Sequence, residues 1–181
     1  MRRLVVIFTV VMSVLAGAIT SALADGALVT VAGKVANTNR GPFDPFTDGF
    51  LNYHDKTFEK AFELDARALA ALPQQSITVD ADVEDWPGAI AMEGPRLKDV
   101  LAAAGAEGGT VTLYALDGFG LEMTPERLTA QDWILASKAG GKPLGIGGHG
   151  PLWLVYDTAG RKATEDEEKT WVWSVFYIAV E

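Results

Sequence analysis

Aromatic and acidic side chains are the residues of this sequence best suited to chemistry. The candidates are Trp86, Trp133, Trp153, Trp171 and Trp173, with Asp82, Glu84, Asp85 and Asp117. Most of the tryptophans are expected in the core, but Trp86 lies in a polar loop, where an amphipathic ring can stack on a flat ligand. Asp117 ends a predicted strand before Gly118. It fits a turn aspartate, and it also fits a carboxylate that accepts two parallel hydrogen bonds from an amidine-like edge.

A glycine-rich segment, residues 145–150 (GIGGHG), matches the letter pattern of dinucleotide-binding loops. That fingerprint must follow a strand and open a helix whose N-terminus holds the pyrophosphate. Here Lys142-Pro143 precedes the segment and a β-rich run follows it, so we interpret it as a turn or a ligand-approach loop. His149 is a candidate site residue because backbone among glycines can approach a ligand closely. His54 is expected at the surface, and the two histidines are too far apart for a helix-borne zinc pair.

Length, charge and cysteine content exclude several classes of function. The chain has 181 residues, a formal net charge of −9 and no cysteine, which indicates a single domain without disulfides, thiolate metal sites or a cysteine nucleophile. The negative charge argues against a nucleic-acid partner, because phosphate binding depends on Lys and Arg. No serine lies in a GxSxG elbow, so a hydrolase triad is not supported.

The first 24 residues have the features of a secretory signal peptide. Arg2 and Arg3 are followed by an apolar run and by Ala22-Leu23-Ala24, which supplies small residues for cleavage after Ala24. An uncleaved membrane anchor is the alternative, but it needs about 20 apolar residues. We therefore expect a periplasmic or secreted mature domain, residues 25–181, without membrane insertion. Its 13 basic and 24 acidic side chains give a formal charge of −11.

The predicted elements place these residues in a mixed α+β domain with one dominant sheet system. Strands are predicted over residues 28–35, 77–83, 110–116, 121–123, 133–137, 151–156 and 171–180. Residues 56–64 fit either a strand or a short helix. Helices are predicted over residues 65–72, from Gly94-Pro95 to residue 104, and from Thr124 onward. Residues 84–92 and 158–169 are predicted to be loops, the second with a solvated acidic run at 165–168.

The order of these segments resembles the sulfite-oxidase-type molybdopterin-binding domain, and in particular its short exported form. The resemblance rests on residues 62–64 and 69–73, Trp86, and residues 94–101, 111–117, 141–144, 150–153 and 171–173. It implies an α+β fold around a β-barrel-like sheet, with a pocket shaped for a pterin. It also implies a cofactor-binding set of Trp86, Asp117, Phe119, His149, Gly150, Trp153 and Asp82.

Two departures from the family bear on function. Catalytic members hold molybdenum through a cysteine thiolate, and the resemblance places Asp82 at the corresponding position. Relatives often carry an arginine for the anionic cofactor near residues 146–149, where this chain has Gly147. A neutral, unphosphorylated pterin therefore fits better than molybdopterin, with its aminopyrimidinone edge on Asp117 and its ring on Trp86 or Phe119.

The resemblance leaves three functions open. The first is an exported protein that captures a small pterin and reports it to a partner, such as a membrane-bound cyclic-di-GMP enzyme, with no catalytic residue and no metal. The second is a molybdopterin-dependent oxidoreductase in which Asp82 or another carboxylate ligates the metal. The third is a scaffold that has lost its ligand. The missing thiolate favours the first.

Overall fold

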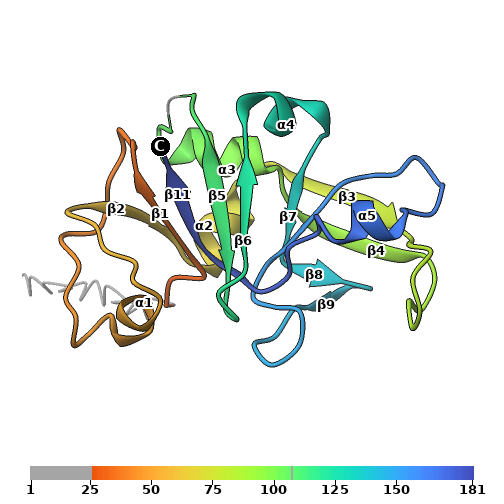
Figure 1. Cartoon of the computed structure of the whole chain (residues 1–181), viewed down its shortest axis with the longest axis horizontal. Coiled ribbons are helices and arrows are strands. Elements are labelled where there is room, and N and C mark those ends of the chain that lie inside the picture. The colour runs from red at the N-terminus through yellow and green to blue at the C-terminus, as the bar shows by residue number, and fades with distance from the viewer. Residues whose placement is uncertain (1–25, 107) are drawn as a thin grey trace, which may run out of the picture.

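The computed structural model describes residues 26–106 and 108–181 (Figure 1). The predicted signal peptide and its cleavage site lie outside the described residues. Within them the chain forms three sheets of five, four and two strands, with five short helices. The predicted α+β class is confirmed. None of the three described sheets closes on itself, so the barrel-like arrangement is not confirmed.

The five-stranded sheet has the order β2-β1-β11-β5-β6. Its strands are β1 (Val29–Gly33), β2 (Ala61–Leu64), β5 (Val111–Ala115), β6 (Gly120–Met123) and β11 (Val175–Val180). β1 runs parallel to β11, and the other neighbours are antiparallel. In β5 buried and half-buried residues alternate, as the period-2 pattern predicts. The ambiguous residues 56–64 end in a strand, β2.

The remaining strands form two smaller sheets. β3 (Gln74–Val79), β4 (Ile90–Pro95), β8 (Lys138–Ala139) and β9 (Lys142–Pro143) pair in that order. β7 (Ile134–Ala136) and β10 (Trp153–Val155) form an antiparallel pair whose residues are all buried. Figure 1 shows the four-stranded sheet to the right of the five-stranded one, with β7 between them.

The helices are short, and three of them, α2, α4 and α5, begin at a side chain that caps them. They are α1 (Gly49–Tyr53), α2 (Ala66–Ala71), α3 (Leu97–Ala103), α4 (Pro125–Ala130) and α5 (Glu165–Glu168). Asp65 caps α2 by accepting a hydrogen bond from Ala68 N (2.7 Å), as predicted. Thr124 caps α4, whose first residue is a proline. Among the described residues we find no helix of the length and apolarity that a membrane span requires.

Several predicted elements are wrong in extent. The strand predicted at 77–83 is β3 at Gln74–Val79, and the strand predicted from residue 171 begins at Val175. Gly94-Pro95 does not open a helix, because both residues pair with β3 as the end of β4; α3 begins at Leu97 and buries the predicted apolar face. The predicted loop at 84–92 ends early for the same reason. The charged loop at 158–169 contains α5, which a Thr164–Glu167 capping box stabilises.

The burial of two aromatic positions also differs from the expectation. Trp133, Trp153 and Trp171 are buried, but Trp173 is 43% exposed, because residues 171–174 precede β11 and Ser174 turns the chain with a φ of 57°. His54 is half-buried and not at the surface, with its ring centroid 4.6 Å from Phe50 and 5.4 Å from Phe176.

We predict that Gly94→Ala destabilises the fold. A Cβ at this position would lie 2.2 Å from Leu135 O and 2.7 Å from Ala136 Cα, so the backbone of β4 or β7 must shift. Overpacking of this kind costs about 1–3 kcal/mol. Thermal unfolding followed by circular dichroism measures the loss. Gly41→Ala is the control, since no atom lies within 4 Å of its added Cβ; equal melting temperatures for the two variants would contradict the prediction.

Candidate functional site

A cavity of about 280 Å³ lies between the β5–β6 turn and the segment that leads from α5 into β11. We call it the turn cavity. It is lined by Ala115, Asp117, Phe119, Glu168, Lys169, Trp171, Val172 and Trp173. Leu116 N donates to Ser174 O (3.1 Å), which holds the turn against the start of β11. The sequence-predicted residues Asp117 and Phe119 are therefore brought together in one cavity.

Asp117 has the geometry of a turn aspartate. Its Oδ1 accepts a hydrogen bond from Phe119 N (2.9 Å), and Gly118 adopts a φ of 91°, a conformation that glycine tolerates. The carboxylate stays exposed, and Oδ2 has no hydrogen-bond partner among the described residues. The ring of Phe119 is 48% exposed beside it. The turn thus fixes a carboxylate next to an exposed aromatic face.

The charges at the turn cavity are mostly negative. Its charged lining residues are Asp117, Glu168 and Lys169. Lys169 Nζ lies 2.9 Å from Glu165 Oε1 and 3.6 Å from Asp166 Oδ1, and the hydrogen bond to Glu165 raises the pKa of Lys169. Because two carboxylates already neutralise this cation, the cavity favours a ligand that donates hydrogen bonds over one that carries phosphate.

Five aromatic side chains form a cluster next to the cavity: Trp86, His149, Trp153, Trp171 and Trp173. Two of them, Trp171 and Trp173, also line the cavity. His149 stacks on Trp153, with centroids 4.3 Å apart and planes at 10°, and meets Trp173 edge-on at 5.7 Å. Trp86 lies 5.9 Å from Trp153 and 5.7 Å from Trp171. The cluster brings Trp86, His149 and Trp153 together, but none of these three lines the turn cavity.

Two indoles of this cluster, Trp86 and Trp153, are held by hydrogen bonds to the backbone. Trp86 is half-buried and its Nε1 donates to Gly88 O (2.9 Å). Trp153 Nε1 donates to Trp171 O (3.1 Å). Both indoles therefore support the wall formed by Trp171, and Trp86 is not the exposed stacking surface that its polar loop suggested.

Gly150 and His149 connect the glycine-rich loop to the segment that carries Trp173. Gly150 N donates to Gly145 O (3.1 Å) and His149 O accepts from Ser174 N (2.9 Å). A Cβ at Gly150 would lie 2.5 Å from Leu144 O, so only glycine fits this close approach. The loop is not followed by a helix, in agreement with the rejection of a dinucleotide site.

Asp82 lies apart from the other predicted site residues. Its side chain is 81% exposed, Oδ1 lies 3.8 Å from Lys162 Nζ, and it does not line the turn cavity. Within residues 26–106 and 108–181, no three His, Asp or Glu side chains are grouped so that they could hold a metal ion. With no cysteine in the sequence, these residues do not fit the thiolate-held molybdenum that the resemblance implies.

The residues that the sequence reasoning missed come from the segment before β11. Glu168 and Lys169 line the cavity, whereas the sequence suggested a solvated acidic run. Trp171 and Trp173 also line it; they were among the candidate tryptophans but were not in the predicted cofactor-binding set. The available signal was a charged run placed immediately before two tryptophans spaced by one residue. The ion-paired end of α5 and the two tryptophans that follow it together form one side of the turn cavity.

Comparison with known proteins supports the fold and nothing finer. No model of a known protein family matches the sequence, and no curated protein matches it. Among solved structures, the sulfane dehydrogenase SoxCD from Paracoccus pantotrophus aligns with a TM-score of 0.56 at 18% identity, over 85% of this chain and 38% of that chain. The chain thus spans well under half of SoxCD. The likeness shows that this chain shares its fold with part of that sulfane dehydrogenase chain.

We predict that Glu167→Gln weakens the fold near neutral pH by about 1 kcal/mol, a partly exposed pair being worth little more. Glu167 accepts hydrogen bonds from Arg161 (2.5 and 2.7 Å), Thr164 N (2.9 Å) and Tyr156 (3.0 Å). The Arg161 hydrogen bonds, then that of Thr164 N, lower the pKa of Glu167 far below its usual range.

A group with a lowered folded-state pKa contributes stability above its unfolded pKa, about 4.3 for glutamate, and loses it as the pH falls further. The free-energy difference between wild type and Glu167→Gln should therefore shrink below about pH 4.3. Urea unfolding at a series of pH values measures it. Glu59→Gln, at an exposed position, is the control; a difference that stays constant from pH 7 to 3 would contradict the assignment.

Proposed function

We propose that this chain is a binding protein that captures a small, unphosphorylated pterin in the turn cavity. The observation that carries the proposal is the Asp117 carboxylate, fixed beside the exposed ring of Phe119 in a cavity whose other wall contains Trp171 and Trp173. Pterins combine a flat bicyclic ring with a row of N–H donors on one edge. The cavity offers a partner for each part.

Hydrogen bonding explains how the polar edge is recognised. The 2-amino group and the ring N–H of a pterin point in parallel, and a carboxylate accepts such a pair with both oxygens. Asp117 Oδ1 already accepts from Phe119 N, but each carboxylate oxygen has two lone pairs. The turn bond therefore orients the carboxylate and leaves it able to accept from the ligand.

We propose that aromatic side chains of the cavity hold the bicyclic ring of the pterin by stacking. Trp86 supports the cluster from behind, so the proposed stacking partners are Phe119, which is 48% exposed, and Trp173, which is 43% exposed. Aromatic rings of this kind prefer offset or edge-on contacts. The cavity of about 280 Å³ is slightly smaller than the usual range for ligand pockets, which begins at about 300 Å³; this favours a bicyclic ring without a phosphorylated tail.

The proposal excludes a molybdenum reaction at Asp82, since Asp82 pairs with Lys162 outside the cavity. The likeness to SoxCD is a likeness of fold, so catalysis is not transferred from that enzyme. We further propose that the protein is exported and reports pterin occupancy to a partner, for which a membrane-bound signalling enzyme of the cyclic-di-GMP type is the candidate.

The first test identifies what the natural protein carries. The protein is purified from its native compartment and denatured, and the released material is analysed by mass spectrometry, fluorescence and metal analysis. A fluorescent pterin without metal is expected. Stoichiometric molybdenum would overturn the proposal in favour of an oxidoreductase.

We predict that Asp117→Asn weakens pterin binding by about 10-fold to 100-fold, because hydrogen bonds to a charged group contribute about 1.5–3 kcal/mol. Isothermal titration with pterin measures the affinity. Asp157→Asn is a matched control, since Asp157 Oδ1 makes the same turn bond to Ala159 N (2.8 Å) and does not line the cavity. Equal affinities for the two variants would show that Asp117 serves only the turn.

A second ligand separates recognition from stacking. Lumazine carries an oxygen in place of the 2-amino group, so it lacks the parallel donor pair. Wild type should prefer pterin to lumazine, and Asp117→Asn should lose that preference. A preference that survives the substitution would place the polar edge of the ligand elsewhere.

A further inference from the structure

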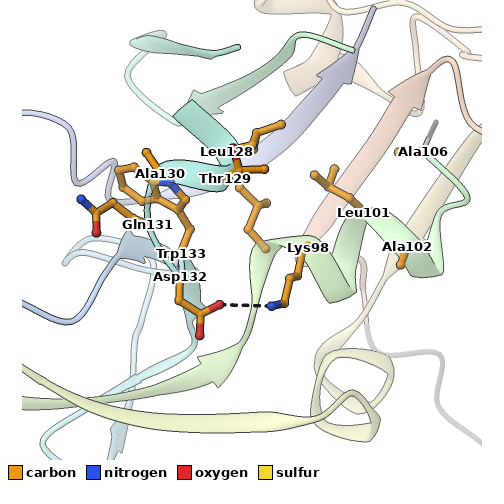
Figure 2. Close-up of a pocket in the computed structure, with 11 residues that line it drawn as sticks. Lys98, Leu101, Ala102, Ala106, Leu128, Thr129, Ala130, Gln131, Asp132 and Trp133 are labelled. Carbon is orange, nitrogen blue, oxygen red and sulfur yellow. Dashed lines mark ion pairs between the residues drawn. The ribbon is translucent and has the colours of Figure 1, made fainter. Parts of the chain in front are cut away.

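A second and larger cavity of about 580 Å³ opens between α3 and α4 (Figure 2). We propose that it is a binding site for a small amphipathic carboxylate, with the apolar body between the two helices and the acidic head at Lys98. We call it the helix cavity. It shares no lining residue with the turn cavity, so the proposal does not rest on pterin binding.

The walls of the helix cavity are apolar and rigidly held. Leu97, Leu101 and Trp133 are each at most 9% exposed. Leu97 N donates to Trp133 O (2.9 Å), which joins the base of α3 to the segment after α4. Trp133 Nε1 donates to Arg127 O (3.0 Å), and its ring packs edge-on against Tyr156 at 4.9 Å. The volume falls within the usual range for small-molecule pockets.

Small side chains leave the cavity open towards the solvent. Figure 2 shows Leu101 and Ala102 of α3 on one side and Leu128, Thr129 and Ala130 of α4 on the other. Ala102 and Ala130 are exposed, so a larger residue at either position would project into space that a ligand would use. An elongated apolar body can enter from this side.

The charges at the mouth are unbalanced in favour of an anion. Asp132 is shared by two cations: its Oδ2 accepts from Arg96 Nε (2.6 Å) and its Oδ1 lies 3.4 Å from Lys98 Nζ. The hydrogen bond from Arg96 lowers the pKa of Asp132, so the carboxylate is charged and is largely committed to Arg96. Lys98 is 70% exposed and, with Asp132, is one of the two charged residues in the lining.

One ammonium with three donors above an apolar cavity matches a carboxylate head with a hydrocarbon or aromatic tail. Binding a phosphate would require several cations in the lining. The charged groups elsewhere on these helices, Asp99, Glu126 and Arg127, do not line the cavity. Straight-chain fatty acids of medium length are therefore suitable probes.

The test compares octanoate, hexanoate and octanol as ligands of the full-length mature protein by titration calorimetry. Octanoate should bind about tenfold tighter than hexanoate, because each buried CH₂ contributes about threefold to fourfold. It should also bind more tightly than octanol, which lacks the charge. Absence of octanoate binding, or equal affinity for octanol, would overturn the proposal.

Two variants locate the binding. Lys98→Gln should weaken octanoate binding by about tenfold, as expected for the loss of a charge-assisted contact, and leave octanol unchanged; Lys60→Gln, at an exposed position outside the cavity, should change neither. Ala102→Trp should abolish octanoate binding while the melting temperature persists. Octanoate affinity unchanged in Ala102→Trp would place the fatty acid elsewhere. The proposal would also be overturned if the wild type is a dimer that binds no octanoate and Ala102→Trp makes it monomeric. The face around the cavity would then be a contact between two copies of the chain.

Discussion

Aromatic packing between the three sheets is the interaction on which the rest of the structure depends. Trp86, from the β3–β4 loop, contacts both Trp153 of β10 and Trp171 before β11. Tyr156 extends the contact from Trp171, at 5.7 Å, to Trp133 beside β7, at 4.9 Å. The rings lie on or next to strands of all three sheets, so a movement of one sheet would break contacts with the others. Since aromatic side chains bury large areas, this chain of rings can replace the disulfides that a chain without cysteine cannot form.

Both cavities use the ends of this aromatic chain as walls. Trp171 and the neighbouring Trp173 line the turn cavity, and Trp133 lines the helix cavity. Trp171 and Trp133 belong to the core and are fixed by packing, whereas the polar groups that would meet a ligand, Asp117 and Lys98, come from a turn and a short helix. Core packing thus sets the shape of each cavity, and residues outside the core determine which ligand groups it can bind.

Local signals in the sequence were sufficient to predict elements but not the cavity. Asp65 capping α2, and the alternation in β5, depend on residues within one segment, and both predictions are confirmed. The burial of Trp86 and the exposure of Trp173 depend on contacts between distant segments and on the turn at Ser174. The same limit affects Asp82, because matching a short loop to a family's order of segments does not reveal that its side chain faces Lys162. No pattern within one segment carries such information.

The two cavities differ most in how their cations are used, and this difference decides what each can bind. At the turn cavity, Lys169 is held by Glu165 and Asp166, so Asp117 faces a ligand with no free cation beside it in the lining. At the helix cavity, Asp132 is shared between Arg96 and Lys98, so a positive charge remains. A hydrogen-bond-donating ring suits the first and an anion the second. A protein with a large negative net charge thus keeps a local excess of positive charge beside the larger of these two cavities, where long-range repulsion of an anion is offset only at short distance.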